Sequence, residues 1–239
     1  MLKVFNTDLH IHTCLSPCGE LDMTPKRIIN AAKLKCLHII GICDHNSCEN
    51  VIITKEIGNT QGIKVIGGIE ITSSEEVHIL ALFDDDAVLL KLQEIIYENL
   101  MEINDEKVYG SQAIVNEDDE IVAYNKRLLI GATKLPVKKL VDLVHSLNGL
   151  VIASHIDREG FGIIEQLGFI PDDLKLDGVE ISSKTPFNEA KSDFPLITGS
   201  DAHFLQDIGK SFTQFLIREP TIKEIKMAFV GKEGRRIKR

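Results

Sequence analysis

Short apolar runs alternate with amphipathic stretches along most of the chain. Seven runs have the length and residue types of buried strands: 4–12, 38–44, 64–71, 77–83, 150–155, 178–182 and 196–201. Between them, apolar residues recur at helical spacing over 25–36, 47–57, 87–102, 136–147 and 221–230. Alternation of strands and helices predicts parallel strand pairing and an α/β fold.

The alternation is interrupted between residues 104 and 135. Two short runs there, 112–115 and 121–124, flank an acidic turn and predict a β-hairpin. Such an insertion is either a surface decoration or a flap that shapes a substrate site. We expect one domain over residues 1–239, with 104–135 inserted in it. The basic stretch 232–239 is expected to be a solvated tail, with attraction of phosphate or RNA as the alternative.

Composition narrows the classes of partner. The net charge of −9 over 239 residues disfavours a large basic surface for duplex DNA, and no apolar run is long enough to span a membrane. Five cysteines lie in the first fifth of the chain, and the N-terminal residues lack the plan of an export signal. Reduced thiols and a cytoplasmic location are therefore expected. The oligomeric state is not indicated.

Polar side chains stand at the ends of the apolar runs. These groups are His10 and His12, Asp44 and His45, Glu70, His155, and Asp201 and His203. In a parallel barrel the carboxyl ends of the strands meet at one face, where functional groups gather. His10 and His12 are two residues apart, so both point to the same face of an extended strand. Asp201 and His203 would repeat that geometry if their strand continues through them.

These groups suit a metal centre. Imidazoles and carboxylates together are ligands for Zn, Mn or Fe(II). A catalytic zinc typically takes three protein ligands, so this larger set predicts two to three divalent ions with a carboxylate such as Glu70 between two of them. His38 and His145 are left out, because His38 begins its strand and His145 lies inside a predicted helix.

The ordered motifs resemble those of the PHP (polymerase and histidinol phosphatase) superfamily. They are Asp-Leu-His-Ile-His-Thr at 8–13, Asp-His-Asn at 44–46, Gly-Ile-Glu at 68–70 followed by His78, Ser-His at 154–155, and Gly-Ser-Asp-Ala-His at 199–203. The resemblance runs from about residue 6 to residue 209. It implies a distorted (β/α)7 TIM-like barrel with its metal site at the carboxyl ends of the strands. The hairpin insertion is not explained by the superfamily core.

The resemblance also implies a distribution of ligands among three ions. The first would be bound by His10, His12, Glu70 and Asp201; the second by Glu70, His78 and His155; and the third by His45 and His203. Asp44 would orient a ligand rather than bind metal. Where relatives place an Asp or His after the His-x-His pair, the nearest donor here is Cys18, which we include because thiolates bind zinc and iron.

The expected activity is that of a multinuclear metal-dependent phosphoric ester hydrolase. It would hydrolyse a small phosphate monoester or a nucleotide through a metal-bridging hydroxide. Candidate catalytic residues are Asp201, His203 and Arg158, the last as a bidentate phosphate ligand. Arg158 could instead pair with an acidic neighbour at 157 or 159, and Lys184 is a weaker phosphate-binding candidate. The alternatives are an exonuclease or phosphodiesterase acting on short oligonucleotides, and a non-catalytic metal-binding regulatory module.

Overall fold

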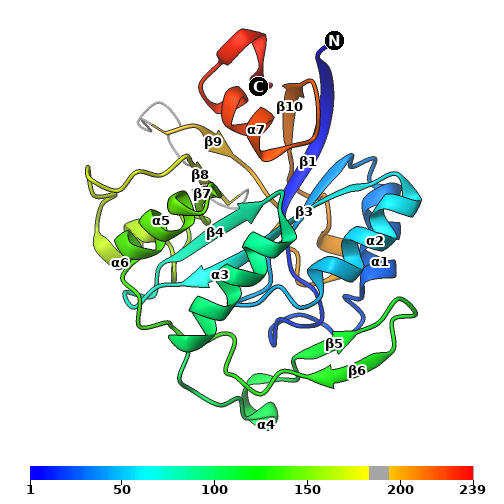
Figure 1. The fold of residues 1–239 in the computed structure, drawn as a ribbon, viewed down its shortest axis with the longest axis vertical. Helices are drawn as coiled ribbons and strands as arrows, with labels where there is room; N and C mark the ends of the chain where they lie inside the picture. Colours follow the sequence, from blue (N-terminus) through cyan, green and yellow to red (C-terminus); the bar gives the residue numbers. More distant parts are fainter. Residues whose placement is uncertain (183–193, 239) are drawn as a thin grey trace.

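The computed structural model describes residues 1–182 and 194–238, and its main sheet curls into a nearly closed barrel (Figure 1). The strands of this sheet are β1 (Lys3–Ile11), β2 (Ile39–Ile42), β3 (Lys64–Thr72), β4 (His78–Phe83), β7 (Leu150–Ala153), β8 (Gly178–Glu180), β9 (Leu196–Ile197), β10 (Thr213–Ile217) and β11 (Arg236–Lys238). Within the described residues their order is β11-β10-β1-β2-β3-β4-β7-β8-β9. The α/β barrel expected from the sequence is confirmed.

The barrel closes along β1. The first half of this strand pairs with β10, from Lys3 to Thr7. At the other end of β1, Ile11 forms a bridge with Ala202, and the His12 N–H donates to the Ala202 carbonyl at 3.0 Å. The carboxyl end of β1 therefore lies beside the chain that follows β9.

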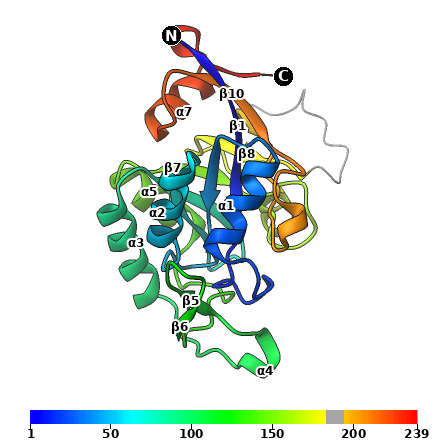
Figure 2. The same cartoon turned by 90° about the vertical axis from the view of Figure 1, so that its right-hand side faces the viewer.

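The helices are α1 (Pro25–Leu34), α2 (Val51–Gln61), α3 (Asp86–Glu98), α4 (Glu106–Tyr109), α5 (Val137–Ser146), α6 (Ile163–Leu167) and α7 (Ile222–Phe229), with 3-10 helices η2 (Leu205–Asp207) and η3 (Lys232–Gly234). In Figure 2, α1, α2, α3 and α5 lie along the outside of the barrel, whereas α7 lies at one end of the molecule and α4 at the other. Alternation along the strands divides the core in two. One cluster joins the strands to the helices and includes Ile28, Leu92 and Leu140. The other includes Ile66, Leu80 and Ile152, with Phe215 of β10 and Ile225 of α7.

All seven predicted strands and all five predicted helices are present, but their directions are not all parallel. β4 is antiparallel to both β3 and β7, and β10 and β11 are also antiparallel to their neighbours. The expectation of parallel pairing was wrong here because the connection between β3 and β4 is only residues 73–77. A parallel crossover needs a dozen residues or more. β9 also ends at Ile197, so Asp201, with φ 48°, is not on an extended strand.

The predicted hairpin is confirmed as β5 (Ala113–Val115) and β6 (Ile121–Tyr124), which lie at the opposite end of the molecule from α7 (Figures 1 and 2). Its acidic turn caps α1, because the Asp119 carboxylate accepts hydrogen bonds from the Thr24 hydroxyl at 2.7 Å and the Lys26 N–H at 3.1 Å. The buried Asn50 amide donates to the Ala113 carbonyl at 3.0 Å. These contacts fasten the hairpin to the barrel.

Most side chains of the described C-terminal residues are exposed, as expected of a solvated tail, but the segment is held in place by Arg235 and by strand pairing. Arg235 is buried, and its guanidinium donates to the Glu224 carboxylate at 2.9 and 3.0 Å and to Glu233 at 2.7 Å. The chain then pairs as β11 against β10. Within the described part of the chain, helices are too short or too polar to cross a membrane.

Candidate metal centre

His10, near the end of β1, and His12, which follows that strand, point toward two carboxylates. His10 Nε2 and His12 Nε2 are 3.1 Å apart. Glu70, near the end of β3, lies 3.3 Å from His10 and 3.4 Å from His12. Asp201 Oδ1 lies 3.3 and 3.2 Å from the same two nitrogens. These four side chains form the group that the superfamily resemblance implies for a first ion.

Glu70 also contacts three histidines from other elements. Its Oε1 lies 3.1 Å from His78 Nδ1 and 3.2 Å from His155 Nε2, and its Oε2 lies 3.2 Å from His45 Nδ1. His78 is the first residue of β4. Because β4 runs antiparallel to β3, with His78 opposite Thr72, its beginning lies at the same face as the end of β3.

Three overlapping groups of donors result, each with ligand atoms within 4.8 Å of one another. They are His10–His12–Glu70–Asp201, His45–Glu70–His78 and His12–His45–His203. Three residues, His12, His45 and Glu70, each belong to two groups. His155 joins through its contact with Glu70. Cys18 is exposed and belongs to none of these groups, so its role as a ligand stays a prediction.

The donors fit divalent cations because several of their polar atoms are otherwise unsatisfied. Two buried ring nitrogens, His78 Nε2 and His155 Nδ1, have no hydrogen-bond partner among the described residues, and His45 Nδ1, His78 Nδ1 and Asp201 Oδ1 have only the close contacts within the cluster. Burying such atoms unpaired is unfavourable. Their concentration in one place is what a binding site for cations requires.

The charges in the cluster are strongly coupled. Burial alone would lower the pKa of His12, but hydrogen bonds to Asp201 and Glu70 raise that pKa to about 9. In the same way Glu180, Glu70 and Asp201 outweigh burial and raise the pKa of His10 well above its usual value. The carboxylates therefore favour positive charge in the cluster, and bound divalent ions would provide that charge in place of the protons on the imidazoles.

Burial keeps His45, His78 and His203 neutral by lowering their pKa values. Burial, reinforced by the charge of His12, lowers the pKa of His203 to about 4. The same two causes lower the pKa of His45 well below its usual value. His203 Nδ1 lies 2.9 Å from the Asp201 carbonyl and must donate to it, so Nε2 carries the free lone pair of the neutral ring.

Asp44 reaches the centre through a residue that the sequence analysis did not select. Its carboxylate accepts from the Ser16 hydroxyl at 2.7 Å and from the Thr13 N–H at 2.7 Å. Ser16 Oγ in turn lies 2.9 Å from His12 Nδ1. Because the Ser16 hydroxyl donates its proton to Asp44, Ser16 Oγ accepts from His12 Nδ1–H, and an acceptor on the far ring nitrogen fixes the orientation of an imidazole. A lone serine in a loop offers no pattern that would have revealed this role.

Glu180 was also missed, although a signal existed. It is the last residue of β8, it is buried, and its Oε2 lies 2.8 Å from His10 Nδ1. The rule that polar groups end the apolar runs would have found it in the run 178–182.

A cavity of about 710 Å³ opens beside the cluster. Asp201 and His203, 19% and 18% exposed, line it together with Arg158. The half-exposed Arg158 forms an ion pair with Asp201 rather than with its acidic sequence neighbours. Lys184 lies outside the described residues.

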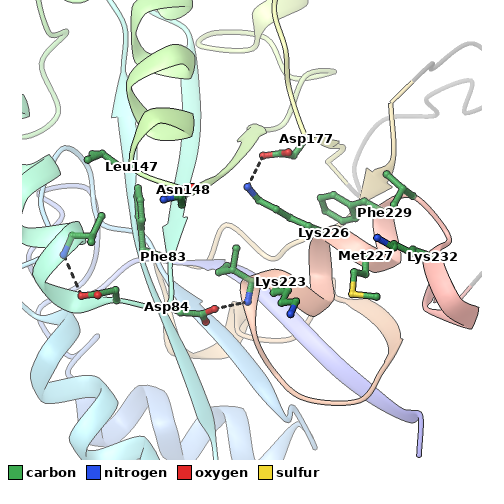
Figure 3. A pocket seen from close by; sticks show the side chains of 14 residues that line it. Phe83, Asp84, Leu147, Asn148, Asp177, Lys223, Lys226, Met227, Phe229 and Lys232 are labelled. Carbon is green, nitrogen blue, oxygen red and sulfur yellow. Dashed lines mark hydrogen bonds and ion pairs between the residues drawn. The ribbon is translucent and has the colours of Figure 1, made fainter.

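A second cavity, of about 790 Å³, lies between α7 and the turn before β7 (Figure 3). Its Lys226 donates to the Gly149 carbonyl at 2.7 Å, and its Asp84 accepts from the first N–H of α7. No histidine is among its described lining residues. Cavity volume alone would therefore point to this larger cavity as the functional site, whereas the candidate metal-binding side chains line the smaller one.

Among the described residues, three of the nine non-glycine residues with positive φ lie at or beside the cluster. Asn46, His155 and Asp201 have φ angles of 50°, 29° and 48°, in the left-handed region. Non-glycine residues in this region cost roughly 1–3 kcal/mol each and gather at functional sites.

Barrel, strand-end donors and cavity together define an α/β-barrel protein with a candidate multinuclear metal site. Family models agree: the PHP domain model matches residues 8–164 and the PHP-associated model matches residues 189–230. The chain belongs to the PHP domain family.

Curated relatives match this chain over only part of their own length. YqxK of Bacillus subtilis, an uncharacterised protein, is 25% identical over 99% of this chain, which spans 64% of that relative. MJ1587 of Methanocaldococcus jannaschii, also uncharacterised, is 34% identical over 32% of this chain and 48% of its own length.

Solved structures share the fold at low identity. Endonuclease Q of Pyrococcus furiosus has a TM-score of 0.73 at 22% identity, covering 98% of this chain and 58% of its own. A candidate metal-dependent phosphoesterase of Bifidobacterium adolescentis has a TM-score of 0.62 at 16% identity, covering 95% of this chain and 96% of its own.

Proposed function

We propose that this chain is a metal-dependent phosphoesterase that hydrolyses a small phosphate monoester or a nucleotide. One observation carries the proposal. His12, His45 and Glu70 each belong to two of the three donor groups, and these groups lie beside a cavity large enough for such a substrate. Two to three divalent ions, Zn, Mn or Fe, fit this set of nitrogen and oxygen donors. When bound, such ions polarise a phosphoryl oxygen and lower the pKa of a water.

The side chains of the cavity have distinct tasks. Asp201 and His203 are the candidate catalytic residues, since both are donors of the cluster and both remain partly exposed to the cavity. With its Nδ1–H held by the Asp201 carbonyl, His203 would offer the lone pair on Nε2 to an ion. Arg158 adds a planar cation beside Asp201, suited to hold two oxygens of a phosphate group.

Metal-dependent hydrolysis of a small ester tests the proposal. Protein stripped with a chelator is assayed against p-nitrophenyl phosphate, nucleoside monophosphates, bis-p-nitrophenyl phosphate and a short oligonucleotide, before and after addition of Zn²⁺, Mn²⁺ or Fe²⁺. We expect the metal to restore hydrolysis of the monoesters. His38→Ala is the matched control, because His38 lies away from the cluster and accepts a hydrogen bond from Asn6.

The other outcomes separate the alternatives. Hydrolysis of the diester and the oligonucleotide alone would replace the proposal with a nuclease. Metal binding without turnover of any ester would make the chain a metal-binding regulatory module. Turnover that survives complete metal removal would refute the metal-dependent reading.

A further inference from the structure

Glu180 contacts two histidines of the donor cluster at once, His10 and His155. Its carboxylate Oε2 lies 2.8 Å from His10 Nδ1 and accepts the His155 N–H at 3.4 Å. Its main-chain carbonyl accepts the Ile156 N–H at 2.9 Å. One residue at the end of β8 therefore braces the ring of His10 and the left-handed turn that presents His155.

Geometry decides which nitrogen of His10 faces the centre. A carboxylate at Nδ1 requires a proton on that nitrogen, which leaves Nε2 toward Glu70 and Asp201, 3.3 Å away in each case. The bond is well protected, since His10 is fully buried and Glu180 is 2% exposed. A carboxylate on the far nitrogen of a metal-binding histidine fixes the tautomer and increases the basicity of the ligand.

Gly199 makes room for this carboxylate. A Cβ built on Gly199 would lie 2.2 Å from Glu180 Oε1 and 3.0 Å from His10 Cβ. The φ angle of Gly199 is not in the left-handed region, so the backbone conformation does not explain the glycine. Glycine is required at position 199 because the Glu180 carboxylate approaches so closely. Glu180 Oε1 is itself a buried atom without a hydrogen-bond partner among the described residues.

We propose that Glu180 is a positioning residue of the metal centre and that Gly199 is its steric partner. Glu180 would orient His10 within the first group of donors, and it would hold His155 beside Glu70. The group His12–His45–His203 has no contact with Glu180 in the described residues and should not depend on it. The inference rests on the proposed function only in that the cluster binds metal.

Titration with Mn²⁺ alone, followed by the electron paramagnetic resonance signal of free Mn²⁺, measures affinity without substrate. We expect Glu180→Ala to weaken the sites containing His10 and His155 by about 10- to 100-fold. Glu180→Gln keeps an oxygen that accepts from Nδ1–H and should recover part of this loss. Gly199→Ala should reproduce the loss although it removes no polar atom.

Glu224→Gln is the matched control. Glu224 is a buried glutamate paired with Arg235 and belongs to none of the donor groups, so this variant can lose stability but should bind Mn²⁺ like the wild type. Nitrogen NMR of the metal-free protein supplies a second readout, because loss of Glu180 should shift the His10 Nδ1 resonance.

Two results would overturn the inference. One is wild-type affinity and stoichiometry in Glu180→Ala. The other is an equal loss of affinity in Glu180→Ala and Glu224→Gln that follows their melting temperatures, which would indicate general destabilisation. Absence of Mn²⁺ binding in the wild type would instead refute the proposed function, and the positioning role with it.

Discussion

Asn46 connects the loop after β2 to the inserted segment, and its replacement measures what that connection contributes. Its side-chain amide donates to the Leu129 and Gly131 carbonyls, both at 2.8 Å, and its Oδ1 accepts the Thr72 N–H at 3.2 Å. Asn46 is fully buried and has φ 50°. It directly follows His45, so the same contacts hold the loop that presents a candidate ligand.

Asn46→Ala removes three hydrogen bonds and places alanine in the left-handed region. At about 1 kcal/mol net for each hydrogen bond, the bonds account for about 3 kcal/mol. Alanine in a left-handed conformation adds roughly 1 kcal/mol. We expect the free energy of unfolding to fall by about 4 kcal/mol in total. Affinity for Mn²⁺ should fall as well, because His45 loses its support.

Urea denaturation of the metal-free protein, followed by circular dichroism, measures the change, and an unchanged m-value shows that the transition is comparable. Asn46→Gly is the control, since glycine loses the same bonds but tolerates the left-handed φ. It should be less destabilised than Asn46→Ala, by roughly 1 kcal/mol or less. A loss below about 1 kcal/mol in Asn46→Ala would refute the hydrogen-bond reasoning. Greater stability of the alanine variant than the glycine variant would refute the backbone reasoning.

Further predictions concern activity and pH. His10→Ala and Asp201→Ala should each lower metal-dependent phosphoesterase activity by about 100-fold or more, and near-normal turnover in either variant would exclude that residue from the centre. Arg158→Ala should lower kcat/KM for a phosphate ester, with Arg158→Lys recovering only part because a single ammonium cannot pair in a bidentate manner; equal values for the two variants would argue against that contact. The hydrogen bond from Arg235 lowers the pKa of Glu224 below its ordinary 4.5, so this pair stabilises the fold above about pH 4.5 and loses that effect as the pH falls through the lowered pKa. The stability difference between wild type and Glu224→Gln, measured by denaturation at several pH values, should therefore shrink in acid, and a difference independent of pH would contradict it.

Much of the candidate site could be read from the sequence because strands have a simple periodicity. For that reason His10, near the end of β1, and His12, just after it, were predicted to point the same way, and Glu70 lies near the end of the next but one strand. The hairpin was equally accessible, since its two runs flank a turn of local residues. Local spacing determines each of these features, and no distant contact is needed to predict them.

Other features depended on how distant segments meet. The reversal of β4 brings His78 to the face where the other strands end, and closure of the barrel places Asp201 and His203 beside β1. Glu180 meets His10 across 170 positions of the chain. The burial of Arg235 likewise needs α7 and β10 in place.

The sequence by itself therefore determined the order of the elements, the inserted hairpin and the kinds of donor at the strand ends, because these follow from periodicity and turn chemistry within short windows. Only the tertiary structure decided which donors share an ion-sized space, which carboxylate orients which imidazole, and why residue 199 is a glycine. Those properties arise from strand direction, barrel curvature and steric contact between segments that are far apart in the chain.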